Sequence, residues 1–475
     1  MKNIIKSFFS FLVVVGLIVL GVMYVSNITE RKESKEKFAQ FYDSEENIDV
    51  LFIGSSHVLN GIFPMDLWRD FGIVSYNMAG HGNRMILNYW VLMNALEHTT
   101  PKLVVLDAYM LSLEDKIRDL EQLHISADAI PYSKTKVDMI NELVDEEERK
   151  NDFLWKFSTY HNRWSVLEKN DFAMITTPEK GAESRSDVAV PVEMRYFEPD
   201  YKIPEEDGIG VEYACKIIEE CQKRDIEILI TYLPFPDNSG WQGESNRMEE
   251  IAMEYGVNFL DFFTLLEQVN LKTDFHDESS HLNPSGARKI TKYIGNYIVQ
   301  NYAIEDHREN EEYSEWHDDF ETYIRFKMEN ICKEEELKNY FMLLSDSDFS
   351  YGIYLKPGSS IEEHPVLIEL LAGMGIDYSQ IPKEDIFIVA DRMNNDYKIM
   401  KLFETMNTRF ATFSMYYNEN GHLELTNSAY KSMIITNSDV AVVVFNNADQ
   451  SFVDQKKFTL ADAILEFNQN TDKNE

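Results

Sequence analysis

The chain has 475 residues, and its hydrophobic (44%) and aromatic (13%) content is enough for packed cores, which excludes a chain that is disordered throughout. Its 82 Asp and Glu residues against 45 Lys and Arg leave a net charge of −37, which disfavours nucleic acids and anionic lipid surfaces as partners. Three cysteines are too few for a disulfide framework or a cysteine-based metal site, and this length predicts two or three globular units.

The N-terminal residues predict a membrane anchor. Residues 8–25 are apolar and uncharged, and Lys2 and Lys6 precede them. About 20 such residues can span a bilayer, and no small-residue cleavage site follows the run. We therefore expect an uncleaved anchor over 1–28 and then a charged, helix-prone stalk over 29–47. The chain is expected to be a single-pass protein of the cell membrane, with its folded part on the extracytoplasmic side.

Five short apolar segments then alternate with helical segments. The expected strands are 48–53, 73–76, 103–106, 226–232 and 257–260, and the expected helices lie around Leu67 and over 86–97, 212–224, 249–255 and 287–302. This alternation predicts an α/β fold, a three-layer α/β/α sandwich around a five-stranded, mainly parallel sheet, in a domain over 48–305. Ligands of such sheets bind at the carboxyl ends of the strands.

The remaining segments divide the chain further. An insertion over 112–210 separates the third and fourth strands and could roof the site, and we expect its Trp164 to lie in the core. The acidic residues 306–319 are expected to be a linker. Residues 320–470 are expected to form an α+β accessory domain, in which no catalytic motif is found.

The first candidate for chemistry follows the first strand, at Gly54-Ser55-Ser56-His57. A glycine permits a tight strand-to-helix turn there, and a serine at this turn is exposed at the edge of the sheet, where backbone N–H groups favour a developing oxyanion. The alternative is a serine that only caps the helix.

Two further segments follow the second and fifth strands. Residues 77–82 (NMAGHG) contain glycines that could aim a backbone N–H at the same place. Residues 274–287 contain His281 with carboxylates a few residues upstream, and such a histidine is what a serine needs for activation. An ordinary glycine loop and a solvated histidine are the alternatives for these two segments.

Together, the three segments resemble the SGNH (GDSL-like) serine hydrolase family over about residues 45–305. The resemblance implies a flavodoxin-like sheet with Ser56 as the nucleophile and His281 as the general base. It also implies that the backbone N–H groups of Ser56 and Gly82 form the oxyanion hole. The carboxylate that orients His281 is Asp277 or Glu278, and we favour Asp277 because aspartate is the usual residue.

One departure from the family pattern concerns the oxyanion hole. The family has an asparagine after the third strand, where this chain reads Asp107-Ala108-Tyr109-Met110. The third donor is therefore missing or comes from elsewhere, such as Asn88 or the insertion.

The anchor, the G-S-S motif and the missing asparagine resemble bacterial proteins of envelope-polymer acylation, of the D-alanylation and alginate-acetylation type. This likeness implies an esterase or O-acyltransferase that acts on an envelope polysaccharide beside a polytopic membrane-bound O-acyltransferase. The alternatives are a non-catalytic binding or scaffold protein of such a complex and a plain carbohydrate esterase.

Other polar residues could line the site. The candidates for holding a polar or anionic substrate are Arg84, His81, His161 and Arg163. His276, Asp277 and His281 could bind a metal, but they lack the spacing of a zinc motif. We therefore expect neither a metal nor a cofactor.

Overall fold

The computed structural model describes residues 2–44, 46–172, 177–190, 208–235, 239–278 and 281–460. Contacts divide the chain into two compact units. The first unit comprises residues 1–183, 193–268 and 288–320, and the second comprises 184–192, 269–287 and 321–475.

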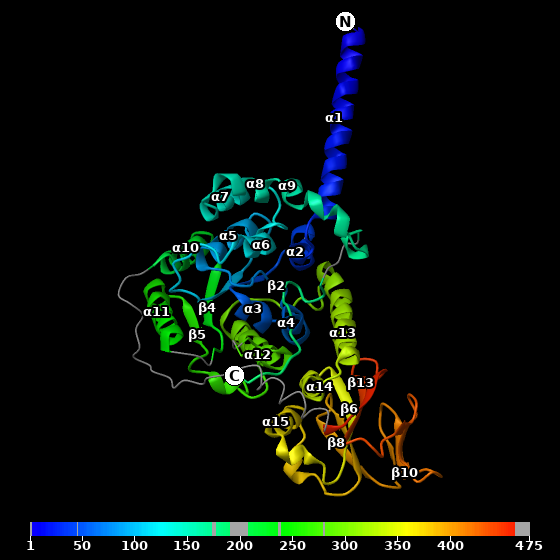
Figure 1. The fold of residues 1–475 in the computed structure, drawn as a ribbon. Coiled ribbons are helices and arrows are strands. Elements are labelled where there is room, and N and C mark those ends of the chain that lie inside the picture. Colours follow the sequence, from blue (N-terminus) through cyan, green and yellow to red (C-terminus); the bar gives the residue numbers. More distant parts are fainter. Residues whose placement is uncertain are drawn as a thin grey trace, which may run out of the picture. The chain divides into compact units, whose positions relative to one another are not determined.

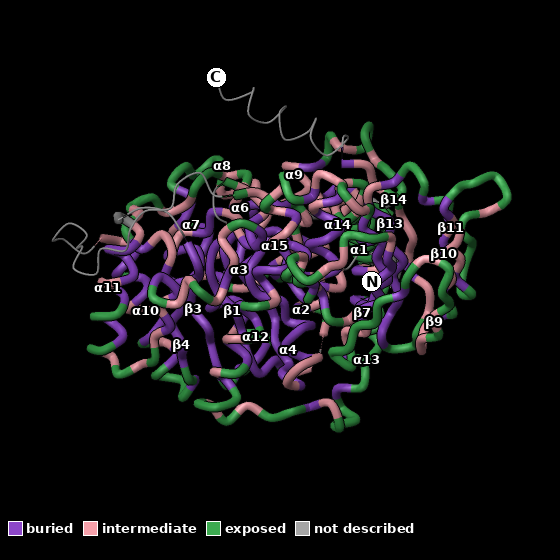
Figure 2. Tube along the Cα trace, turned by 90° about the horizontal axis from the view of Figure 1, so that it is seen from below, coloured by how far each residue is buried: buried purple, intermediate pink, exposed green. Residues whose placement is uncertain are grey.

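The first unit is built on a five-stranded parallel sheet with the order β2-β1-β3-β4-β5. Its strands are β1 (Val50–Ile53), β2 (Ser75–Asn77), β3 (Leu103–Asp107), β4 (Glu227–Tyr232) and β5 (Asn258–Asp261). β1, β2 and β3 are buried along their whole length, as expected for strands covered on both faces (Figure 2). The predicted sheet is confirmed.

Helices cover both faces of this sheet. The chain steps from β1 to β2 in one direction and from β1 past β3 to β5 in the other, so right-handed crossovers place their helices on opposite faces (Figure 1). On one face α4 (Pro64–Phe71) packs against α12 (Pro284–Asn301), where Gly295 leaves room for Phe71. On the other face α5 (Met85–Ala95) contacts α10 (Ile209–Lys223), and α11 (Ser239–Tyr255) follows β4. The α/β/α fold class is confirmed.

The described part of the 112–210 insertion is mostly helical. Its elements are α6 (Leu120–Ala127), α7 (Lys134–Leu143), α8 (Glu147–Leu154), α9 (Lys156–Tyr160) and the 3₁₀ turns η1 (His161–Val166) and η2 (Lys169–Phe172). α7 contacts α5, while α9, η1 and η2 contact α1 (Lys2–Thr29), the apolar N-terminal helix. Residues 191–207 of the insertion lie outside the described residues.

Residues 29–47 and 306–319, which the sequence predicts to be a stalk and a linker, both pack aromatic side chains into the core. Helix α2 (Glu33–Asp43) buries Phe38 and Phe41, each 1% exposed. Trp316, in α13 (Glu315–Lys333), is fully buried against Trp68, with 5.5 Å between ring centroids. In both segments the aromatic side chains face the core, which their charge alone does not predict.

The second unit contains two antiparallel sheets. The first has the order β14-β13-β6-β7-β8, and the second has the order β12-β11-β10-β9. The strands are β6 (Phe349–Leu355), β7 (Ile386–Asp391), β8 (Asp396–Lys401), β9 (Thr405–Asn407), β10 (Thr412–Tyr417), β11 (Leu423–Asn427), β12 (Met433–Ile434), β13 (Val440–Asn446) and β14 (Phe452–Phe458).

The central strands of this unit are buried on both faces. Alternate residues of β6 and β13 pack with α14 (Leu337–Leu344) and α15 (Pro365–Gly373), and the residues between them pack against the second sheet. The accessory fold is therefore α+β, as expected.

The packing of Trp316 can be tested by truncation. Trp316→Ala removes a buried indole and its 2.7 Å hydrogen bond to Glu46, so we expect the first unit to lose about 3–5 kcal/mol of stability. The measurement is thermal unfolding of the full chain in detergent. Met253→Ala, at a side chain that is 72% exposed, is the control and should leave Tm unchanged. Equal Tm values for the two variants would contradict the packed position of this segment.

Candidate active site

β1 ends at Ile53, and Gly54 and Ser55 form the turn that follows. Ser56 is then the first residue of the short helix α3 (Ser56–Gly61). The N-cap is Ser55, whose hydroxyl accepts a hydrogen bond from the backbone N–H of His57 at 3.4 Å. The capping role that a serine in this motif can fill therefore belongs to Ser55. Ser56 itself is 7% exposed.

Glycines are required where the loops of the site approach each other. A Cβ on Gly54 would lie 2.5 Å from Val58 and 3.1 Å from Asp107, so only glycine fits this turn. The Gly54 carbonyl accepts a hydrogen bond from the Gly80 backbone N–H at 3.2 Å, which ties the loop after β2 to the turn after β1. Gly82, in the same loop, has a φ of 64°, a conformation that favours glycine.

Asn77 holds this loop against α3. Its Nδ2 donates to the carbonyls of Val58 (2.8 Å) and Ile62 (3.0 Å), and its Oδ1 accepts from the Ala79 backbone N–H (3.1 Å). Because every contact is buried, one asparagine fixes the helix that begins with Ser56 and the loop that carries Gly82.

An aromatic cluster that the sequence pattern does not predict lies beside Ser56. The His57 ring stacks on Tyr109, with centroids 4.0 Å apart, and also contacts Phe235 at 4.8 Å. Trp241 completes the cluster, 4.8 Å from the Tyr109 ring. His57 and Phe235 are buried, whereas Tyr109 and Trp241 are partly exposed. Tyr109 stands in the block where the family has its asparagine.

The loop after β3 is held by two buried carboxyl groups, of which the first is Asp107. Its Oδ1 accepts hydrogen bonds from the Leu233 backbone N–H (2.9 Å) and the Thr231 hydroxyl (3.4 Å). Burial, helped by the charge of Glu244, nevertheless raises the pKa of Asp107 to about 7.

The second carboxyl group is Glu244, in α11, which is fully buried. It accepts hydrogen bonds from the backbone N–H groups of Met110 (3.0 Å) and Ser112 (2.7 Å) and from the Tyr232 hydroxyl (3.1 Å). Burial raises the pKa of Glu244, and these donors oppose the shift. Met110 has a φ of 69°, which is unfavourable for a side chain, so Glu244 stabilises a strained loop. Nothing in the sequence marks this glutamate among the others.

Three further sequence candidates lie in the first unit. Arg84 donates from Nη1 to the Met110 sulfur at 2.9 Å. The Nε2 atom of His81 lies 3.0 Å from a Glu183 carboxylate oxygen. Asn88 is 1% exposed, and its two amide atoms have no hydrogen-bond partner in the described part of the chain.

His281 and Asp277 belong to the second unit and form a close pair. The distance between His281 Nδ1 and Asp277 Oδ2 is 2.7 Å, and the His281 backbone N–H donates to Asp277 Oδ1 at 3.1 Å. Burial opposes ionisation of Asp277, but the hydrogen bonds and charge of His281 outweigh it and lower the pKa of Asp277 to about 2. Glu278, the other candidate carboxylate, is exposed.

The backbone around this pair is fixed by Asn283. Its Nδ2 donates to the carbonyls of Thr273 (2.8 Å), Phe275 (3.2 Å) and Asp187 (3.2 Å), and its Oδ1 accepts from the Ser285 backbone N–H (3.0 Å). This asparagine therefore joins the segment before the pair to the start of α12. Such buried hydrogen bonds hold a histidine in one orientation.

His276 lies next to the pair. Its ring is 5.5 Å from that of His281, and burial lowers its pKa although the Asp277 charge opposes the shift. Ligand atoms of His276, Asp277 and His281 lie within 4.8 Å of one another, which is close enough to hold a metal ion. The sequence expectation of no metal therefore needs a direct test.

The candidates from the insertion lie at the end of α1. Arg163 Nη1 donates to the carbonyls of Thr29 (2.7 Å) and Glu30 (2.8 Å), so its guanidinium caps that helix. His161 is exposed, and its Nδ1 lies 2.8 Å from the Ser158 carbonyl oxygen. Trp164 is 72% exposed, so its expected place in the core is wrong.

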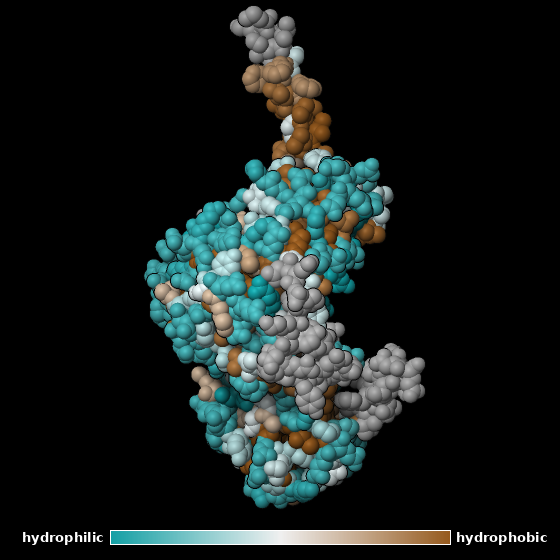
Figure 3. Space-filling model, turned by 90° about the vertical axis from the view of Figure 1, so that its left-hand side faces the viewer, coloured by the Kyte–Doolittle hydropathy of each residue, from teal (hydrophilic) through white to brown (hydrophobic). Residues whose placement is uncertain are grey.

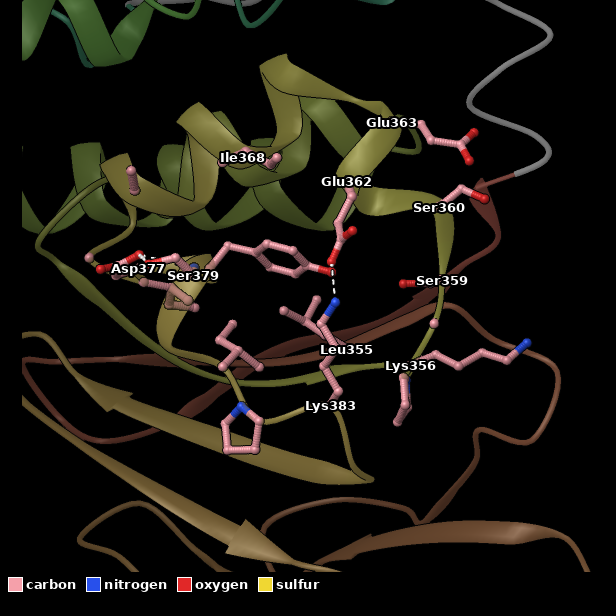
Figure 4. Close-up of a pocket in the computed structure, with 18 residues that line it drawn as sticks. Leu355, Lys356, Ser359, Ser360, Glu362, Glu363, Ile368, Asp377, Ser379 and Lys383 are labelled. Carbon is pink, nitrogen blue, oxygen red and sulfur yellow. Dashed lines mark hydrogen bonds and ion pairs between the residues drawn. The ribbon is translucent and has the colours of Figure 1, made fainter.

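The second unit also has a groove of about 940 Å³ between β6, α15 and the loop before β7 (Figure 4). Two of its lysines are paired with carboxylates, Lys383 with Glu362 at 3.0 Å and Lys356 with Asp439 at 3.4 Å. Asp377 accepts hydrogen bonds from Ser379 and thereby caps a 3₁₀ turn (Tyr378–Gln380). These contacts account for Lys356, Glu362, Asp377, Ser379 and Lys383 by local structure.

Comparisons with known proteins give fold-level likenesses only. The chain matches no protein-family model and no curated protein. Among solved structures, it is similar to a candidate acylhydrolase from Bacteroides fragilis, with 11% identity and a TM-score of 0.29 over 56% of this chain and 95% of that one. It is also similar to a candidate lipolytic protein of the G-D-S-L family from Desulfitobacterium hafniense, with 13% identity and a TM-score of 0.28 over 53% and 99% of the two chains. Because these values are low, the two likenesses carry no assignment below.

The raised pKa of Asp107 predicts a pH dependence of stability. The carboxyl group has a pKa of about 7 in the fold against ~3.9 in an unfolded chain, so its ionisation costs stability progressively as the pH rises from about 4 to about 7. Asp107→Asn keeps an oxygen for Leu233 and stays neutral, so it should raise Tm relative to the wild type at pH 8 and much less at pH 5.

The measurement is thermal unfolding of the full chain at both pH values. Asp115→Asn, at an exposed carboxylate in the same loop region, is the control and should give no such difference. A Tm difference between Asp107→Asn and the wild type that is the same at both pH values would show that this carboxyl group does not titrate as described.

Proposed function

We propose that this protein is a membrane-anchored serine esterase or O-acyltransferase that works through an acyl-enzyme intermediate. The observation that carries the proposal is the Asp277–His281 pair. A carboxylate with a pKa of about 2 is ionised at neutral pH, and its hydrogen bond to Nδ1 selects the tautomer in which Nε2 can accept a proton. This bond supports Asp277 over Glu278 as the orienting carboxylate.

In the proposed reaction, His281 Nε2 takes the hydroxyl proton of Ser56 as Oγ attacks the carbonyl carbon of an ester. The backbone N–H groups of Ser56 and Gly82 stabilise the tetrahedral oxyanion. The intermediate then collapses, the leaving alcohol takes the proton from His281, and an acyl-Ser56 ester remains. In the second half-reaction His281 takes a proton from water or a sugar hydroxyl as its oxygen attacks the acyl carbon. The bond from that carbon to Ser56 Oγ then breaks, Oγ takes the proton from His281, and the acid or the acylated sugar leaves.

The aromatic cluster supports a substrate with a flat apolar face. Tyr109 and Trp241 are its partly exposed members. Tyr109 stacks on His57, the residue after Ser56, and Trp241 contacts Tyr109. Sites for organic ligands combine such aromatic walls with a few polar groups. We assign this role to Tyr109 and Trp241 in preference to Arg163 and His161, because the Arg163 guanidinium already binds the end of α1.

Helix α1 supports the membrane part of the proposal. Its residues Ser7–Thr29 form an apolar helix of 23 residues, and the apolar stretch of this helix is not buried in the protein. Such a helix extends about 35 Å, enough to cross the hydrocarbon core. We further propose, from the family resemblance alone, an extracytoplasmic site, an envelope polysaccharide as acyl donor or acceptor, and a polytopic membrane-bound O-acyltransferase as partner.

A non-catalytic binding protein is the second candidate function. It is favoured by Tyr109, which stands where the family has an oxyanion asparagine and stacks on the residue after Ser56. An aromatic platform without a third oxyanion donor could hold an acylated sugar and leave the ester intact.

Fluorophosphonate labelling of the full chain in detergent tests the proposal. We expect labelling of the wild type and none of Ser56→Ala. Ser55→Ala is the matched control, because it removes only the helix cap, at a cost of about 1 kcal/mol, and should still be labelled. A folded protein in which Ser55→Ala and Ser56→Ala are labelled equally would refute Ser56 as the nucleophile.

The carboxylate is tested by the rate of p-nitrophenyl acetate hydrolysis. Asp277→Asn should reduce the rate by about 10³–10⁴-fold, because the wrong histidine tautomer is then favoured, whereas Glu278→Gln should remain near the wild type. EDTA should change neither rate nor labelling. Loss of activity with EDTA would instead assign His276, Asp277 and His281 to a metal site.

A further inference from the structure

Large apolar side chains are exposed together where α1 meets the first unit. Trp155 is 55% exposed, Trp164 72%, Val166 62% and Phe172 65%, and all four lie in residues 155–172, here called the foot segment. The chain has six tryptophans, all in its described part, and only Trp155 and Trp164 are exposed. Figure 3 shows the apolar surface of α1 and further apolar side chains among the hydrophilic ones on the body beside it.

The foot segment is attached to the last turn of α1. Arg163 donates to the carbonyls of Thr29 and Glu30, and Lys156 Nζ contacts the Glu30 carboxylate at 2.5 Å. α9, η1 and η2 all contact α1. The position of this segment along the α1 axis is therefore fixed by hydrogen bonds and ion pairs.

Other aromatic side chains of the same region fill the core beneath it. Phe153 is 1% exposed and stacks on His124, with ring centroids 3.9 Å apart. Tyr160 is 5% exposed, and its hydroxyl contacts Asp128 at 2.5 Å. Phe153 and Tyr160 thus pack inward, whereas Trp155, Trp164 and Phe172 are mostly exposed.

The length of α1 sets the depth of the foot segment. The uncharged apolar run ends at Val25, and Thr29 lies four residues further, which is about 6 Å along a helix axis. Since α1 leaves the hydrocarbon core near Val25, the residues that bind Thr29 and Glu30 lie at the depth of the lipid headgroups. Tryptophan is enriched at this interface because its ring is apolar and its N–H is polar.

Charge around the foot segment is balanced. A hollow of about 350 Å³ beside it is lined by three cations, Arg31, Lys32 and Arg163, and by three carboxylates, Glu36, Glu168 and Asp171. The chain as a whole carries −37, so this face avoids the repulsion that other acidic surfaces would meet at a membrane. Contact here would depend on apolar side chains and little on lipid charge.

We propose that the foot segment is a second membrane contact, in which Trp155, Trp164, Val166 and Phe172 insert into the headgroup layer of the bilayer that α1 spans. This inference rests on the proposed anchoring by α1. The bilayer is the occupant that the structure favours, because α9, η1 and η2 contact α1 itself, whose side chains Tyr24 and Val25 near that end are 66% and 44% exposed. The contact would hold the first unit at a fixed orientation above the membrane.

Quenching of tryptophan fluorescence by lipid tests the contact. The full chain is placed in nanodiscs, one chain per disc, made of phosphatidylcholine with or without bromine near the headgroup end of the acyl chains. Bromine quenches only tryptophans that touch it, so wild-type emission should fall in brominated discs. Trp155→Phe/Trp164→Phe should abolish that fall and keep the wild-type Tm. Added anionic lipid should leave the wild-type quenching unchanged.

A third variant separates this inference from the anchoring itself. Phe11, 63% exposed in α1, is replaced by Trp in the Trp155→Phe/Trp164→Phe background. Strong quenching of Phe11→Trp together with equal quenching of the wild type and the double variant would overturn the foot contact and leave the anchor intact. That result would also fit a foot segment covered by a second copy or a protein partner. Absence of quenching of Phe11→Trp would refute the anchor and the foot contact together.

Discussion

The close approach of the Gly54 turn to β3 is the constraint on which the candidate site depends. No side chain fits at residue 54, because Val58 and Asp107 already occupy the space that a Cβ would need. The same turn places the Gly54 carbonyl 3.2 Å from the Gly80 backbone N–H, and Asn77 binds the carbonyls of Val58 in α3 and of Ile62 directly after it. The absence of a Cβ atom at Gly54 therefore permits the close packing that positions Ser56 and the loop with Gly82.

The loops around this turn are held by buried polar groups rather than by apolar packing. Asp107 and Glu244 are both buried, and burial raises the pKa of each, so ionising them in the fold costs free energy. In return, Glu244 satisfies backbone N–H groups of a loop in which Met110 has a strained φ. A fold selected for stability alone would avoid such an arrangement, whereas perturbed carboxyl groups and strained backbone gather at functional sites.

The parts that could be predicted from the sequence are those in which local pattern and final environment agree. β1 and β3 are continuous apolar runs because both faces are buried, and the turn at Gly54 follows from its glycine. The packing of Trp316 and the exposure of Trp164 could not be predicted, because apolar character does not show what covers a side chain. Glu244 was not found because only the tertiary fold distinguishes one buried carboxylate from 82 acidic residues.

Helix α1 is connected through α2 to the loop that carries Gly82. α2 begins at Glu33, shortly after the end of α1, and the Tyr76 hydroxyl in β2 donates to the Lys37 carbonyl of α2 at 2.7 Å. Lys37 Nζ in turn contacts the Ala79 carbonyl, in the loop that carries Gly82. The end of α1 is therefore joined to the candidate oxyanion loop through one short, packed helix. In the membrane-anchored function that we propose, this packed connection would hold the site at a set distance from the bilayer, which a flexible stalk would not do.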